Sequence, residues 1–99
     1  MNADALATAA NVYHAINMWH GFGPAPEWPR DYKFVAAIPT SDVEEAFDLT
    51  NHVHGAWQDN PAIFVHENGR NARSTSMGDV VATLEGVYRC EAVGWTKIA

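Results

Sequence analysis

The stretch from Val80 to Ile98 limits the possible folds more than any other, because short β-rich runs alternate in it with turn signals. The runs 80–84 and 87–90 flank Glu85-Gly86, a dipeptide typical of a tight hairpin turn. A third run, 92–98, follows at once. This spacing predicts a three-stranded antiparallel meander.

The segment before the meander predicts the corner at which the meander begins. The hydroxyl groups of Ser74 and Ser76 can hydrogen-bond their own backbone, which favours turns over strand ladders. Gly78 permits a positive φ, and Asp79 can then accept backbone N–H groups. A tight turn over residues 76–79 is therefore predicted.

Three short segments of the C-terminal half form a further pattern. They are Arg73-Ser74-Thr75-Ser76-x-Gly78-Asp79-Val80, Tyr88-Arg89-Cys90 and Val93-Gly94-Trp95. Upstream stand Phe47-x-Leu49-Thr50-Asn51, Trp57 and Asn60-Pro61. Together they resemble the YodL-like domains and a set of small phage- and plasmid-encoded proteins, over about the last two-thirds of the chain. The resemblance implies a serine-rich turn before two strands and an origin in a mobile element, and it supplies no catalytic residues.

Length and composition predict one domain over residues 1–99, in which an N-terminal helix and a Pro-rich connector (1–31) precede a sheet and a second helix (32–99). No run approaches the ~20 apolar residues of a membrane span, and the start lacks a basic signal-peptide region. The single cysteine, Cys90, excludes an internal disulfide and is expected to be a buried thiol. A cytoplasmic location in the host cell is the default expectation.

The formal charge of −6 is unevenly distributed. Residues 1–66 hold eight acids against two bases, Arg30 and Lys33. Such an excess repels nucleic acid, which argues against direct DNA or RNA binding. It suits instead the basic surface of a partner protein.

Residues 3–20 are rich in Ala and free of Gly and Pro, which predicts a helix. Tyr13 and Ile16 belong to its expected apolar stripe. Gly21 and three prolines then end the helix, and the connector 21–31 contains Trp28.

Residues 32–38 predict a strand in which Tyr32, Phe34, Ala36 and Ile38 lie on one face. A capping box formed by Ser41 and Glu44 predicts the start of a second helix over 42–53. A short strand is expected over 62–66. The predicted fold is α+β, with two helices packed on a small, mostly antiparallel sheet of four to five strands.

The second helix presents acids on its outer face, and tryptophans occur in the connecting segments. Tryptophan is enriched where interface energy concentrates. The candidate binding residues are Glu44, Glu45, Asp48, Trp19, Trp28 and Trp57.

These features predict a small non-enzymatic module from a phage or other mobile element that binds a host protein. Its specific form is an inhibitor of a defence system, of the anti-CRISPR or anti-restriction type. One alternative is a structural domain that forms homo-oligomers, such as a homodimer. Another is a small hydrolase that uses Ser74 or Ser76 with Asp79 and a histidine, either His66 or His54. No cofactor is expected, and the spacing of His52, His54 and His66 does not suit a metal site.

Overall fold

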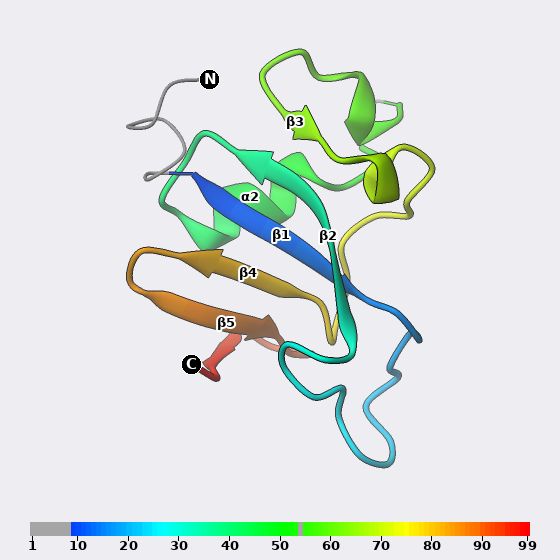
Figure 1. The fold of residues 1–99 in the computed structure, drawn as a ribbon, viewed down its shortest axis with the longest axis vertical. Helices are drawn as coiled ribbons and strands as arrows, with labels where there is room; N and C mark the ends of the chain where they lie inside the picture. Colours follow the sequence, from blue (N-terminus) through cyan, green and yellow to red (C-terminus); the bar gives the residue numbers. More distant parts are fainter. Residues whose placement is uncertain (1–8, 54) are drawn as a thin grey trace.

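The computed structural model describes residues 9–53 and 55–99, and its strands form one sheet in the order β3-β2-β1-β4-β5-β6 (Figure 1). All the neighbouring strands are paired antiparallel. The strands are β1 (Ala10–Ala15), β2 (Tyr32–Ile38), β3 (Phe64–Val65), β4 (Val80–Thr83), β5 (Gly86–Cys90) and β6 (Trp95–Lys97). The helical elements are α2 (Val43–Leu49) and the 3-10 helices η1 (Trp57–Asp59) and η2 (Glu67–Gly69).

The fold is thus α+β in kind, but the described residues hold one α-helix and a six-stranded sheet. The prediction of two helices on four to five strands was wrong, because the described residues hold fewer helices and more strands. Strand β2 lies at the predicted bounds, but a register shift against β1 places Ala36 and Ile38 in the core and Tyr32 and Phe34 on the opposite face. Strands β4, β5 and β6 form the predicted meander, with β6 shorter than the run predicted over 92–98. Strand β3 is shorter than the strand predicted over 62–66.

The largest correction concerns the predicted helix over 3–20. Residues 10–15 of that range form β1, which lies in the middle of the sheet between β2 and β4, and residues 3–8 lie outside the described part. Both faces of β1 are packed, so its sequence does not alternate between polar and apolar residues. Alanine has the highest helix propensity, and the alanines of this segment therefore favoured the prediction of a helix. Backbone hydrogen bonds to two neighbouring strands outweigh the local helix preference.

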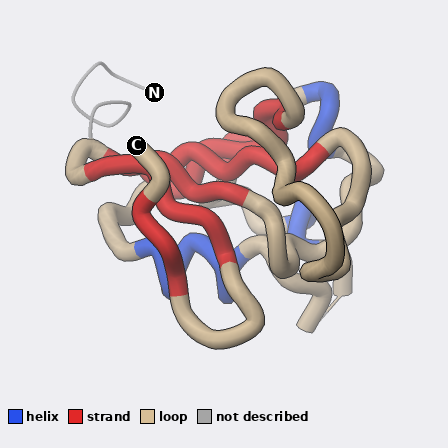
Figure 2. Tube along the Cα trace, turned by 90° about the horizontal axis from the view of Figure 1, so that it is seen from below, coloured by secondary structure: helices blue, strands red, loops and turns tan. Residues whose placement is uncertain are grey.

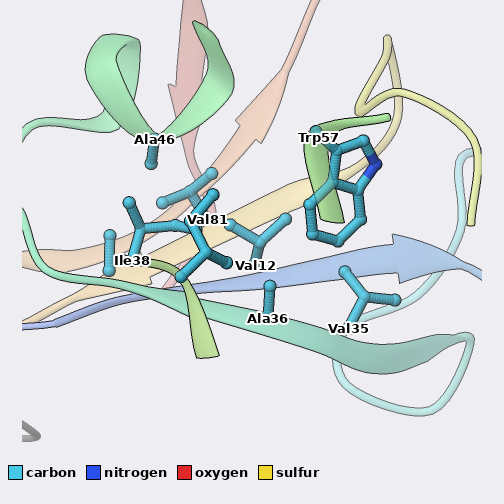
Figure 3. Close-up of a cluster of buried hydrophobic side chains, with 9 residues drawn as sticks. Val12, Val35, Ala36, Ile38, Ala46, Trp57 and Val81 are labelled. Carbon is cyan, nitrogen blue, oxygen red and sulfur yellow. The ribbon is translucent and has the colours of Figure 1, made fainter. Parts of the chain in front are cut away.

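The hydrophobic core lies between the sheet and α2. Ala46 of α2 packs with Val12 of β1, Ile38 of β2 and Val81 of β4, and Trp57 of η1 extends the cluster (Figure 3). In Figure 2, α2 lies on one side of the strands. No described helix covers the opposite face of the sheet, which carries a second, smaller buried cluster of Ala15, Tyr32 and Val80, with Tyr13 and Trp28 packed against it.

The start of α2 differs from the predicted capping box. Asp42 is the N-cap, and its Oδ1 accepts the Glu44 N–H at 3.0 Å. Ser41 does not cap the helix, and the Glu44 carboxylate accepts instead from the indole of Trp95.

Helix α2 also ends earlier than residue 53. The buried hydroxyl of Thr50 donates to the Ala46 carbonyl, and the Thr50 carbonyl accepts the Thr75 N–H from the corner before β4. This tertiary bond diverts the chain from the helix axis, and Val53, the last residue of the predicted helix, is 67 % exposed.

Candidate functional site

The helix-free face of the sheet carries a row of aromatic rings, here called the aromatic strip. Side chains alternate between the two faces of a strand, so Tyr13 points away from α2 because Val12 points toward it. Four rings form the strip: Trp28 of the connector, Tyr13 of β1, Phe34 of β2 and Phe64 of β3.

The rings of the strip are in continuous contact. Trp28 meets Tyr13 edge-on with centroids 4.9 Å apart, and Tyr13 lies 5.5 Å from Phe34. Phe34 stacks on Phe64 at 6.5 Å with an interplanar angle of 19°. The imidazole of His66 packs against the same Phe34 ring at 5.3 Å. Edge-on and offset contacts of this kind each stabilise by about 0.5–1.5 kcal/mol beyond area burial.

The strip combines exposure with a lack of charge. Phe64 is 53 % exposed, and the rings of Tyr13, Trp28 and Phe34 are half-buried. Among the described strand positions on this face, Arg89 of β5 is the charged one, and its guanidinium already pairs with Glu91 at 2.9 Å. Exposed aromatic area that forms a contiguous patch is typical of an interaction surface.

The predicted acidic residues lie on the other side of the molecule. Glu44, Glu45 and Asp48 are exposed on α2, and none of them forms an ion pair with a described basic residue. Glu44 is engaged by the Trp95 indole at 2.8 Å. Trp28 lies on the helix-free face, so the indole of Trp28 and the three acids of α2 do not form one surface.

The three candidate tryptophans have three different environments. Trp28 belongs to the aromatic strip. Trp19 is half-buried, donates from Nε1 to the Phe22 carbonyl, and lies 5.5 Å from the Arg89 guanidinium. Trp57 is 3 % exposed, and its indole donates to the Arg73 carbonyl. The prediction that Trp57 contributes to a binding surface was therefore wrong, because its ring fills the core.

The predicted corner before β4 is confirmed and is organised by a buried carboxylate. Asp79 is fully buried and accepts the backbone N–H of Ser76 at 2.8 Å and of Ala15 at 2.9 Å. The guanidinium of Arg73 donates a hydrogen bond to each oxygen of the Asp79 carboxylate, at 2.6 and 3.0 Å. Gly78 has a φ of 92°, which favours glycine at this turn. The carboxylate thus joins β1 to the turn.

A buried histidine completes this polar cluster. His14 of β1 places Nε2 at 2.9 Å from the Thr75 hydroxyl and 3.9 Å from Asp79. Burial lowers the pKa of His14 from 6.5 to about 4; the Asp79 charge raises it, and the charges of Arg73 and Lys33 lower it. The imidazole is therefore neutral at pH 7.

Among the described residues, the geometry does not bring together the hydroxyl, carboxylate and imidazole of the predicted hydrolase. Ser74 accepts the backbone N–H of His52, and Ser76 accepts from Arg73. His66 caps η2 through its Nδ1 and packs on Phe34. His54 lies outside the described residues. The hydroxyl and imidazole that do meet, Thr75 and His14, are each 1 % exposed, and the Thr75 hydroxyl and Nε2 of His14 are already committed to each other.

Two further features bear on chemistry. Burial raises the pKa of the Cys90 thiol to about 11, helped by the charges of nearby acids, so the buried thiol stays protonated at neutral pH. Within residues 9–53 and 55–99, no group of three His, Cys, Asp or Glu side chains is placed to hold a metal ion.

In the same part of the chain, every helix is too short or too polar to cross a membrane.

Sequence reasoning missed most of the strip. The alternation in β2 marks Phe34, but Tyr13 was assigned to a helical stripe and Phe64 to an ordinary short strand. Only the order β3-β2-β1 places their rings beside one another.

Comparison with known proteins identifies no relative: no family model matches the chain, and no curated protein or solved structure is significantly similar to it. The resemblance to YodL-like domains therefore stays a prediction.

Proposed function

We propose that this chain is a small non-enzymatic binding module from a phage or other mobile element, and that it docks on a host protein through the aromatic strip. The observation that supports this most is the contiguous row of partly exposed rings on a sheet face without a covering helix. Large rigid rings bury much apolar area at little cost in conformational entropy, and they concentrate binding energy in protein interfaces.

The partner has a basic surface next to its contact site. The formal charge of −6 attracts such a surface over a distance, and Glu45 and Asp48 on α2 add to this field. In its narrower form, the proposal makes the partner a defence protein whose nucleic-acid-binding surface is blocked by the module. The aromatic strip supplies the contact surface, and Glu45 and Asp48 accelerate association with the basic surface of the partner.

Paired substitutions test the strip. Phe64→Glu places a charge on it, whereas Leu84→Glu places the same charge on an apolar residue that is 78 % exposed at the β4–β5 turn. The wild-type chain is immobilised and exposed to host lysate, the captured protein is identified and purified, and its binding to the wild type and to each variant is measured by calorimetry. We expect Phe64→Glu to weaken binding at least about tenfold, and Leu84→Glu to leave it within about twofold.

A third variant separates contact from steering. With Glu44, Glu45 and Asp48 all changed to Lys, we expect slower association and a weaker salt dependence, but retained docking. Equal binding by Phe64→Glu and wild type contradicts the proposal. Loss of binding in the triple variant alone would move the contact site to α2.

A further inference from the structure

A small cavity lies at the end of β1, on the face of the sheet that carries Val12. Its volume is about 240 Å³, and its lining includes His14, Lys33 and Arg73. His14 and Lys33 are register partners in β1 and β2, so they stand side by side at the cavity. A water molecule takes about 30 Å³ of liquid, so the cavity has room for roughly eight waters or one small organic molecule.

The cavity reaches one nitrogen of the buried histidine. Nε2 of His14 is committed to the Thr75 hydroxyl, and the hydrogen bonds of the described residues include none to Nδ1. Among the described residues, no fully buried side-chain nitrogen or oxygen lacks a partner, which fits an Nδ1 that faces the cavity and not the packed interior. His14 lines this cavity, and Nδ1 is therefore available to a bound molecule. In the tautomer in which Thr75 donates to Nε2, Nδ1 carries the proton and is a donor.

The cavity has a surplus of one positive charge. The Arg73 guanidinium is already neutralised by the carboxylate of Asp79. Lys33 is exposed at the rim and forms no ion pair with a described acid. None of the lining residues is acidic, and Asn71 adds an amide that can donate. These groups suit a ligand with a single negative charge.

Part of the cavity wall is apolar. Ile16 and Met18 form this part of the wall, and they are 56 % and 50 % exposed, so neither side chain is buried in the hydrophobic core. An inorganic ion would leave this wall unused, whereas a short hydrocarbon body would cover it. The wall therefore selects a ligand with both an anionic head and an apolar tail.

We propose that this cavity binds a small organic monocarboxylate. Its carboxylate lies between the Lys33 ammonium, the Asn71 amide and Nδ1–H of His14, and its hydrocarbon body lies against Ile16 and Met18. This site is separate from the aromatic strip and does not depend on the docking function proposed above.

Titration of the ¹⁵N-labelled full chain with butyrate tests the site. The comparison ligands are acetate, inorganic phosphate and butyramide, the last having the same shape as butyrate without the charge. At constant ionic strength, we expect butyrate to give saturable shifts at the His14 ring and at the amides of Asn71 and Arg73. The ring nitrogen shifts of the bound form should report the proton on Nδ1.

Two variants and one control identify the groups involved. Lys33→Gln is expected to weaken butyrate binding at least about tenfold, because it removes a charge-assisted hydrogen bond. Lys97→Gln, which removes an exposed charge from β6, should leave binding within about twofold. Met18→Ala should bring the affinity for butyrate down to that for acetate.

Several results would overturn the proposal. They are the absence of saturable shifts, equal shifts with butyramide, and phosphate binding as tight as that of butyrate. Equal binding by Lys33→Gln and Lys97→Gln would do the same, as would a ring proton that stays on Nε2 in the bound form.

Discussion

At the scale of single residues, Asp79 is the group on which the corner before β4 depends. Its carboxylate takes two backbone N–H groups and both arms of a guanidinium while fully buried. A buried charge is tolerated only when its partners are complete, so loss of either partner costs more than the net worth of the pair. The contacts of Asp79 thereby give the RSTSMGD segment a structural role at this corner.

Asp79→Asn is expected to destabilise the protein by about 3 kcal/mol, because Arg73 keeps its charge but loses its counter-ion. Urea unfolding followed by tryptophan fluorescence measures the change. Glu85→Gln, at an exposed acid without an ion pair to a described base, serves as the control and should stay within about 0.5 kcal/mol of wild type. A similarly small effect of Asp79→Asn would contradict the role given to the carboxylate.

His14 predicts how stability depends on pH. The folded pKa of about 4 lies below the unfolded 6.5, so the unfolded chain binds more protons between these values. The free energy of unfolding should be highest above about pH 6.5 and fall by about 3 kcal/mol by about pH 4 from this residue. Comparing urea unfolding of wild type and His14→Gln across this range isolates the contribution of His14. Parallel pH profiles for the two proteins would show that His14 is not the cause.

At the scale of elements, the approach of η2 to β2 depends on a glycine. A Cβ on Gly69 would collide with the Val35 carbonyl, which belongs to the backbone of β2 and cannot rotate aside as a flexible side chain would. The close approach also brings the His66 N–H to the Val35 carbonyl at 2.9 Å. The position of η2, and with it the His66 ring beside the strip, therefore depends on a residue without a side chain.

Gly69→Ala should lower the free energy of unfolding by about 2–3 kcal/mol, because backbone must move to admit the methyl group. Gly23→Ala is the control, since its φ of 72° is strained for alanine but nothing lies within 4 Å of an added Cβ. It should cost about 1 kcal/mol. Equal costs for the two variants, measured by urea unfolding, would show that the close contact does not matter.

At the scale of the whole molecule, a partly exposed aromatic face without a covering helix raises the question of self-association. Under the proposed function, the strip is kept for a different protein, and a net charge of −6 disfavours pairing of identical copies. Edge strands β3 and β6 are also short, which limits edge-to-edge pairing of two sheets.

We expect light scattering at micromolar concentration to give the monomer mass of 10.9 kDa. A dimer that Phe64→Glu dissociates and Leu84→Glu preserves would mean that a second copy occupies the strip. That result would replace the host-protein proposal with the homo-oligomer alternative.

The sequence by itself determined those elements whose signals are local. The bounds of β2, the meander and the Ser76–Asp79 turn follow from alternation, turn dipeptides and a glycine that permits positive φ, and all are confirmed. Acids on the outer face of α2 were also predictable, because polar residues there have no core to enter.

Only the tertiary structure decided the identity of β1, the end of α2, and the membership of the strip and the monocarboxylate cavity. Each depends on partners distant in sequence: β4 pairs with β1, Thr75 binds the Thr50 carbonyl, and Arg73 closes on Asp79 across from His14. Local propensities differ by less than about 1 kcal/mol per residue, so pairing and burial at long range outweigh them. Which side chains meet at a surface is therefore set by strand order, which no local pattern encodes.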